Sequence, residues 1–301
     1  MINAIEHYLA VRHATGFALT NTTYLLRSFG RFAAARGDTH IRTATAIAWA
    51  AQSVSATQRS ERLKTVCRLA SYLHVDDAQH ELPPADHFGS PKRRPVPYLY
   101  SQEEIRQLIA AARQLPPLHS VRPLTYATVL GLLAATGLRV SEALTLQVAD
   151  FTPLGLVIRR TKFGKTRLVP LHDTTAQVLE QYRSRWRPRQ SGEVALFVDE
   201  DGDPLQYGKF YRTFQHLVKV TQLARPTGRR FRLHDLRHTF AVRALEASPH
   251  GRHHLSRHML ALATYLGHVG IHTTYWYLDT TPDLLRAVAC AGEAFFEGGS
   301  Q

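Results

Sequence analysis

The stretch Arg232-Leu233-His234-Asp235-Leu236-Arg237-His238 is the most informative part of the chain, because it sets basic and imidazole groups in a short, fixed order. Downstream it is followed by Leu266-Gly267-His268 and then by Tyr277. Upstream of it lie Arg139 and Lys162. Two guanidiniums, an ammonium, two imidazoles and a phenol can bind a phosphate, move protons and attack phosphorus. The set therefore predicts cleavage of DNA without a metal ion.

The net charge of the chain indicates a polyanionic partner. Among 301 residues, Lys and Arg number 37 against 24 for Asp and Glu, a formal net charge of +13. Nucleic acid, and double-stranded DNA in particular, is the leading candidate. A membrane surface would attract the same charge, but we find no basic amphipathic N-terminal helix and no apolar run that could span a bilayer. A chain of this length most naturally forms two domains.

The N-terminus and the cysteines indicate the compartment. Met1–His7 has neither the basic region nor the apolar core of a signal peptide, so we expect a cytoplasmic, nucleoid-associated protein. Cys67 and Cys290 are far apart in apolar helical contexts and support neither a disulfide nor a thiolate metal site. We expect no cofactor and no bound metal.

The first 80 or so residues predict a helical bundle, because apolar residues recur there at helical spacing. The following segment, Pro83–Pro97, is rich in proline and basic residues and predicts a linker. Its Lys92, Arg93 and Arg94 either follow a DNA backbone or are only solvated. We therefore predict an N-terminal helical domain at 1–85, a linker at 86–98 and a second domain at 99–301.

The second domain predicts helices and one small β-hairpin. Ser101 and Glu104 form a capping box that begins a helix. Gly137 ends another helix, and this places Arg139 in a tight turn between helices. Apolar runs at 156–158 and 167–171 flank the lysine-containing loop as a hairpin, and a further short strand is expected at 196–198. Other helices are expected at about 123–136, 173–186, 207–223, 233–245, 256–265 and 282–296.

Taken in order, these motifs resemble those of the tyrosine recombinase (phage integrase) family, including Xer-type and transposon-associated members, across nearly the whole chain. The resemblance implies a mainly α fold with a SAM-like core-binding helical bundle and a mixed α+β catalytic domain that carries a small hairpin sheet. The matching motifs are Thr136–Glu142, Lys162 with Arg167–Leu171, His234–His238, Leu266–His268 and Tyr277.

The resemblance gives the cationic and imidazole groups their roles. Arg139 and Arg237 would clamp the phosphate, because a guanidinium presents a planar fork that can engage two oxygens at once. His234 and His268 would donate further hydrogen bonds, and His234 would accept the phenol proton. His238 resembles the family's structural position.

Zinc is an alternative for His234 and His238, which lie four residues apart as in zinc-binding helices. Asp235 stands where such helices carry a glutamate base, and no third ligand is evident.

The offset of Tyr277 from His268 matches the family's nucleophile. In-line attack would leave a 3′-phosphotyrosyl bond and a free 5′-hydroxyl, so that rejoining needs no ATP. Tyr275 and Tyr265 are alternative nucleophiles.

Lys162 would supply the proton that the leaving 5′-oxygen needs. Alignment on the motif that begins at Arg167 selects Lys162 over Lys165, which is then a phosphate contact or an ordinary solvated charge.

Basic residues outside the catalytic set are expected to bind DNA or only to face solvent. Four of them share one predicted helix of the first domain. The full set is Arg59, Arg62, Lys64, Arg68, Lys92, Arg93, Arg94 and Lys165.

Two other stretches imitate binding motifs. Asp199–Asp203 begins like a calcium-binding loop, but Pro204 stands at its glycine position, so a plain turn is expected. The histidine-rich run His250–His258 is expected to be a basic loop before the next helix.

The resemblance implies a site-specific recombinase or integrase that cleaves and rejoins DNA through a 3′-phosphotyrosyl intermediate, without metal or ATP. Four protomers, identical or including related recombinases, would exchange strands through a Holliday junction, with the tail 282–296 docked on a neighbour. The alternatives are a non-catalytic architectural DNA-binding protein and a relaxing enzyme of type IB topoisomerase character. The target site and the element served, whether phage, transposon, integron or chromosome, do not follow from the sequence.

Overall fold

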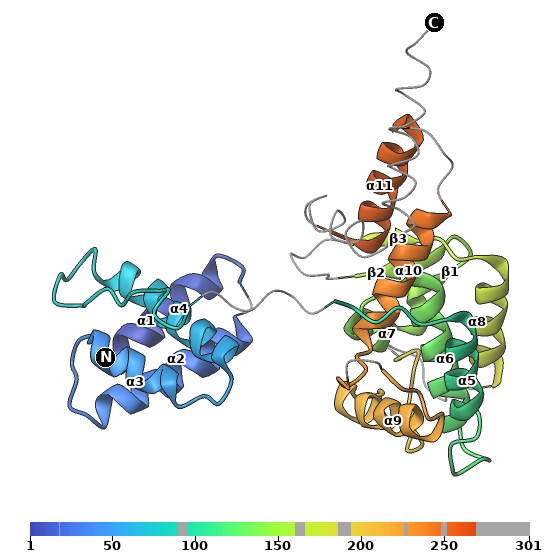
Figure 1. The fold of residues 1–301 in the computed structure, drawn as a ribbon, viewed down its shortest axis with the longest axis horizontal. Helices are drawn as coiled ribbons and strands as arrows, with labels where there is room; N and C mark the ends of the chain where they lie inside the picture. The colour runs from blue at the N-terminus through green and yellow to red at the C-terminus, as the bar shows by residue number, and fades with distance from the viewer. Residues whose placement is uncertain are drawn as a thin grey trace, which may run out of the picture. The chain divides into compact units, whose positions relative to one another are not determined.

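The structure is a computed structural model that describes residues 1–17, 19–89, 96–159, 166–185, 194–225, 228–247 and 252–268, with the backbone alone over 252–256. The chain divides into two compact units, Met1–Pro95 and Val96–Gln301. Figure 1 shows a helical N-terminal unit and a larger second unit in which helices accompany a small sheet. The fold is therefore mainly α with one small β element, as predicted.

The N-terminal unit is a bundle in which one long helix, α4, contacts each of the other three. The core of the bundle includes Ile5, Phe29, Trp49 and Leu69, one from each helix. The rings of Phe29 and Trp49 meet edge to face with centroids 5.5 Å apart. Phe88, which follows the last helix, packs against the same core. The helices are α1 (Ile2–Ala14), α2 (Thr20–Ala34), α3 (Thr43–Ala51) and α4 (Ala56–Leu73).

The second unit is built around α6, which packs against α5, α7, α8 and α10. This helix is buried around most of its circumference, because neighbours cover it on several sides. The helices of the unit are α5 (Gln102–Ala112), α6 (Arg122–Thr136), α7 (Val140–Leu144), α8 (Asp173–Arg185), α9 (Tyr207–Val220), α10 (His234–Glu246) and α11 (Arg252–Leu266), with a 3-10 turn η1 (Val148–Asp150).

A three-stranded antiparallel sheet lies in the second unit, in the order β1-β2-β3. Its strands are β1 (Phe151–Thr152), β2 (Gly155–Ile158) and β3 (Arg167–Val169). The hairpin of β2 and β3 confirms the prediction, with Ile158 opposite Arg167. Because β3 also contacts α11, the sheet joins the lysine-containing hairpin to the C-terminal helix of the described residues.

Local predictions had mixed outcomes. The capping box is confirmed: the Glu104 N–H donates to Ser101 Oγ at 3.0 Å, and the Ser101 N–H donates to Glu104 Oε2 at 2.7 Å. The strand at 196–198 is wrong, because Leu196 and Phe197 bend into the core and only isolated bridges flank them. The loop predicted at His250–His258 is also wrong from Arg252 onward, where α11 begins.

Candidate active site

The turn that carries Arg139 depends on a glycine. Gly137 follows α6 in the left-handed region, with φ of 60°. A Cβ at this position would lie 2.5 Å from Phe240 Cδ1, so a larger residue would be both strained and crowded. Arg139 then becomes the N-cap of α7, and its backbone N–H donates to Glu142 Oε2 at 3.0 Å.

Glu142 anchors the side chains around this turn. Its side chain is 7% exposed, and its carboxylate accepts from Arg139 Nη1 at 2.7 Å and from Arg167 Nη1 and Nη2 at 3.0 and 2.8 Å. Burial alone would raise the pKa of Glu142, but hydrogen bonds from Arg167 and from Arg139 outweigh burial and lower the pKa to about 2. The carboxylate is therefore ionised at neutral pH.

Arg237 ties two distant backbone segments together. It projects from α10 and is only 2% exposed. Its Nη1 donates to the Gly137 carbonyl at 2.7 Å, and its Nη2 donates to the Leu266 carbonyl at 2.8 Å. The first segment leads into Arg139 and the second into His268, so one guanidinium connects the neighbourhoods of both.

The end of α11 brings His268 to the same place. Gly267 has a φ of 68°, which turns the chain out of the helix, and the His268 N–H donates back to the Ala263 carbonyl at 2.9 Å. Arg139 Nη2 donates to the Gly267 carbonyl at 3.2 Å. Arg139 and Arg237 thus donate to successive backbone carbonyls, those of Gly267 and Leu266, in the turn that leads into His268.

The three histidines around this site favour the neutral form. Burial is the main cause at each, and nearby charges add to it: the pKa falls to about 4 for His234, to about 3 for His238 and to about 4 for His268. The His234 residue is itself exposed to solvent, so screening moderates the shift of its pKa. The rings of His234 and His238 meet edge to face with centroids 4.6 Å apart. At neutral pH these side chains are uncharged donors or acceptors.

Several predicted site residues lie outside the described residues. These are Lys162, Lys165, Tyr277, the alternative nucleophile Tyr275, the linker residues Lys92, Arg93 and Arg94, and the tail at 282–296. The other alternative nucleophile, Tyr265, is described. Burial raises the pKa of its phenol to about 12, and its hydroxyl donates to the Pro170 carbonyl at 3.4 Å.

The four basic residues of α4 do not share one face. Arg59 Nε donates to the Ser53 carbonyl at 2.6 Å, and Arg62 stacks over the Trp49 ring at 4.4 Å. With about 3.6 residues per turn, Lys64 and Arg68 lie on the other side of the helix. Arg59 and Arg62 therefore have structural contacts within the N-terminal unit.

Sequence reasoning did not assign Glu142 or Arg167 to the site. Glu142 lies three residues after Arg139 at the start of a helix, a spacing that brings the two side chains together. Arg167 is the first residue of β3, directly after the lysine-containing loop. The spacing of Arg139 and Glu142 could therefore have identified Glu142 from the sequence. Nothing in the sequence indicates that Arg167 pairs with Glu142, which lies 25 positions earlier.

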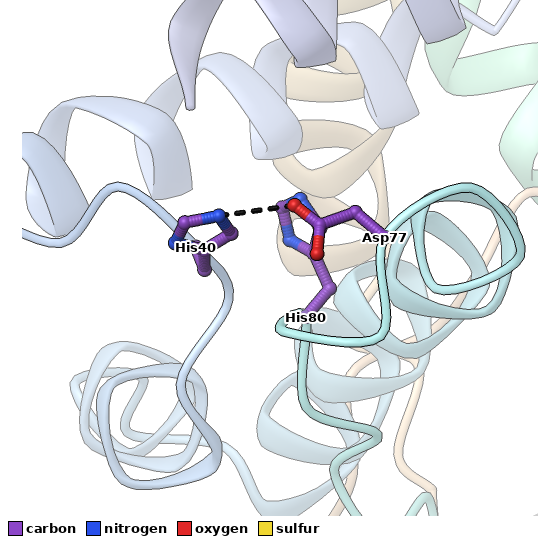
Figure 2. Close-up of side chains that lie close together, drawn as sticks. All are labelled: His40, Asp77 and His80. Carbon is purple, nitrogen blue, oxygen red and sulfur yellow. Dashed lines mark hydrogen bonds and ion pairs between the residues drawn. The ribbon is translucent and has the colours of Figure 1, made fainter.

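A possible metal site occurs elsewhere, in the N-terminal unit. Among the described residues, the one group of His, Cys, Asp and Glu side chains with metal-binding spacing is His40, Asp77 and His80, with ligand atoms within 4.8 Å of one another (Figure 2). The Ile41 N–H donates to His80 Nδ1 at 3.1 Å. Because Nδ1 accepts this bond, the hydrogen of neutral His80 is on Nε2. A metal ion on Nδ1 would displace the Ile41 N–H, and a metal ion on Nε2 would move the ring hydrogen to Nδ1. Metal binding by His80 would therefore break this backbone hydrogen bond. His40 instead pairs directly with Asp77 at 3.1 Å.

Solved structures of tyrosine recombinases share this fold. The Tn1549 transposon integrase in complex with transposon right end DNA superimposes with a TM-score of 0.66 at 17% identity, over 94% of this chain and 97% of that one. A lambda integrase dimer bound to a COC′ core site gives a TM-score of 0.66 at 18% identity, over 93% of this chain and 77% of that one. This chain therefore has the fold of the tyrosine recombinases.

Sequence relatives then establish the family. The phage integrase family model matches residues 99–283. The putative integrase/recombinase y4rB of Sinorhizobium fredii (strain NBRC 101917 / NGR234) is 38% identical over 295 residues, 94% of each chain. Tyrosine recombinase XerD of Oceanobacillus iheyensis is 33% identical over 209 residues, 67% of this chain and 65% of that protein. The chain belongs to the phage integrase family and is a tyrosine-type site-specific recombinase.

No helix within the described part of the chain is both long and apolar enough to cross a membrane.

Proposed function

We propose that this recombinase cleaves and rejoins DNA through a 3′-phosphotyrosyl intermediate formed on Tyr277, with no metal ion and no ATP. The observation that supports this most strongly is the hydrogen-bonded connection of Arg139, Arg237 and the turn before His268. Phosphoryl transfer develops charge on the non-bridging oxygens, and preorganised guanidiniums stabilise that charge at little cost in reorganisation.

In the proposed first step, the Tyr277 phenol oxygen forms a bond to phosphorus and the bond from phosphorus to the 5′-oxygen breaks. The phenol proton passes to a ring nitrogen of His234, which is neutral and can accept it. Lys162 gives a proton to the departing 5′-oxygen. Attack of a 5′-hydroxyl on the phosphotyrosine reverses these transfers, so the diester bond energy is retained.

The two histidines near the arginines suit an anionic substrate. His234 and His268 lose their charge in the free protein partly because Arg237 repels a proton on either ring. A bound phosphate would offset that repulsion and raise the pKa of both rings. The proton affinity of His234 would then be greatest when a phosphate is present.

The partner is proposed to be double-stranded DNA, bound by a tetramer of this chain alone or with related recombinases. Support comes from a lambda integrase structure described as a tetramer bound to a Holliday junction. In the N-terminal unit, Lys64 and Arg68 are the better candidates for phosphate contacts, because Arg59 and Arg62 have internal partners. The tail at 282–296 is proposed to dock on a neighbouring protomer, and the protein is proposed to act in the cytoplasm.

Covalent trapping tests the proposal. Duplexes are selected from a randomised pool by binding to the protein and are then nicked at successive positions, so that cleavage releases a short strand and cannot be reversed. We expect a protein–DNA adduct in EDTA, its loss in Tyr277→Phe, and its retention in Tyr275→Phe. Mass spectrometry of the adducted peptide identifies the residue. An adduct that persists in both variants, or cleavage that needs magnesium, would contradict the proposal.

The same material separates the alternative functions. DNA binding without any adduct indicates an architectural protein. An adduct with relaxation of supercoiled plasmid, but no exchange between two selected sites, indicates a relaxing enzyme.

A further inference from the structure

We infer that Arg167 is a positioning residue: its guanidinium fixes Arg139 through Glu142 and fixes the turn before His268 through the Tyr265 carbonyl. The inference rests on the proposed function only in assigning cleavage as the reaction that these groups serve. The positioning itself can be measured in the free protein.

Arg167 has hydrogen-bond partners on two separate segments of the chain. Its Nε donates to the Tyr265 carbonyl at 2.9 Å, while Nη1 and Nη2 donate to the two oxygens of Glu142 at 3.0 and 2.8 Å. The side chain is 11% exposed, so water does not replace these partners. Three acceptors on two sides of one planar group match the donor geometry of arginine and not that of lysine.

Arg167 also sets the net charge of the cluster that it forms with Glu142 and Arg139. Glu142 also accepts from the Arg139 backbone N–H and from Arg139 Nη1. A pair of Arg139 and Glu142 alone would have no net charge. Arg167 restores one positive charge, so Arg139 can be held by a carboxylate while the cluster stays attractive to a phosphate.

The Arg167 guanidinium lies close to Gly267. A Cβ on Gly267 would lie 2.7 Å from Arg167 Nη1 and 2.9 Å from its Cζ. Arg139 Nη2 donates to the carbonyl of the same glycine at 3.2 Å. Arg167 and Arg139 therefore both contact this turn, and His268 follows it directly.

The position of Arg167 in the chain connects the site to the hairpin of β2 and β3. Arg167 begins β3 opposite Ile158 of β2, and the residues between the two strands include Lys162. A single guanidinium thus joins the strand that leaves the lysine-containing loop, the helix that starts at Arg139 and the C-terminal end of α11.

Hydrogen exchange of the free protein tests the positioning. In Arg167→Met, amide exchange should rise by roughly tenfold or more in peptides spanning 138–144 and 264–268, because the bonds that hold both segments are lost. Arg167→Lys should give a smaller rise. Arg159→Lys is the matched control, because Arg159 follows β2, pairs with Asp150 and is 58% exposed, so neither peptide should change. Equal exchange in Arg167→Met and in the unmodified protein would overturn the inference.

Single-turnover adduct formation on the nicked duplex tests the consequence for the reaction. At saturating DNA, Arg167→Met should slow the reaction by on the order of 10²-fold with little change in Kd, and Arg167→Lys should recover part of the rate. If Arg167 acts through Glu142, the double variant Glu142→Gln with Arg167→Met should be within about threefold of the slower single variant. Multiplied losses, or a loss confined to Kd, would overturn the inference.

The two proposals fail in different ways. If the unmodified protein forms no adduct while Arg167→Met loosens both peptides, the phosphotyrosyl mechanism is wrong and the positioning by Arg167 stands. If the adduct forms and Arg167→Met changes neither exchange nor rate, the mechanism stands and the positioning is wrong.

Discussion

Arg237 illustrates how a single residue can have both a structural and a proposed chemical role. Its guanidinium donates to two backbone carbonyls that belong to segments 100 and 29 residues away in the sequence. Because it is almost fully buried, these bonds are strong and directional. The residue therefore organises the turns around Arg139 and His268 as well as supplying positive charge.

Replacing Arg237 by lysine should affect cleavage far more than binding. An ammonium cannot reproduce the fork, so we expect single-turnover cleavage to fall about 10²- to 10³-fold, the loss seen when a transition-state donor is removed. The matched control is Arg243→Lys on the same helix, because Arg243 also donates to a backbone carbonyl, that of Tyr100. Thermal unfolding checks that both variants are folded. Equal losses of rate in the two variants would contradict the prediction.

The neutral histidines make the second unit sensitive to acid. His268 and His238 have pKa values lowered to about 4 and about 3, below their ordinary value of 6.5. Below pH 6.5 these two histidines therefore take up protons when the protein unfolds. Their contribution to stability is complete above pH 6.5 and declines as the pH falls toward 4. Once the pH has fallen to the folded-state pKa, the loss of stability is on the order of 3 kcal/mol for His268 and on the order of 5 kcal/mol for His238.

Urea unfolding at pH 7.5, 6 and 5 measures this dependence. His238→Gln should show a shallower decline of the free energy of unfolding with falling pH than the unmodified protein. Parallel declines in the two proteins would contradict the assignment to His238.

Among the elements, the α6–α7 turn makes the clearest demand on sequence. Gly137→Ala should lower the free energy of unfolding by roughly 1–2 kcal/mol or more, because an L-residue is strained at this φ and its Cβ would collide with Phe240. Gly131→Ala, within α6, is the control: its Cβ would meet only Ile109 Cδ1 at 3.8 Å. That change should stabilise the protein by about 0.5–1 kcal/mol. Chemical denaturation of both variants measures their free energies of unfolding, which should change in opposite directions.

Local chemistry accounts for the elements that the sequence predicts well. The capping box at Ser101, the glycine end of α6 and the β2–β3 hairpin each depend on neighbouring residues. The beginning of α11 within the histidine-rich run was missed, because side-chain composition alone does not exclude a helix there. At the bend, the Leu196 N–H donates to the Leu146 carbonyl at 2.7 Å, a contact between residues far apart in the sequence.

The candidate site also has a part that the sequence predicts and a part that only the folded chain shows. The ordered motifs pointed to Arg139, Arg237 and His268 as a set, but not to the carbonyls and the carboxylate that hold them. The bond from Arg167 to Tyr265 spans 98 positions, and such contacts follow only from the folded chain. The parts played in cleavage by Lys162 and Tyr277 stay predictions.

At the scale of the whole molecule, the two units have separate hydrophobic cores. One core gathers residues of α1–α4, and the others gather residues of the second unit. Units with their own cores can unfold separately, so we expect two calorimetric transitions in the full chain.

Core variants assign those transitions. Leu69→Ala in α4 and Leu133→Ala in α6 each truncate a leucine that is at most 1% exposed. Each should cost about 2–5 kcal/mol, and each should lower the midpoint of one transition while leaving the other unchanged. A single transition that both variants shift equally would show that the units unfold together.

The burial of the Glu142 carboxylate between Arg139 and Arg167 affects how strand scission responds to ionic strength. Dissolved ions weaken attraction between exposed charges, including those that draw a basic protein to DNA, but they penetrate poorly to a pair that is 11% and 7% exposed. Added potassium chloride should therefore loosen the complex steeply, while strand scission within complexes already formed proceeds at nearly constant speed. Capture of the substrate and its chemistry would then respond to the cell's electrolyte independently.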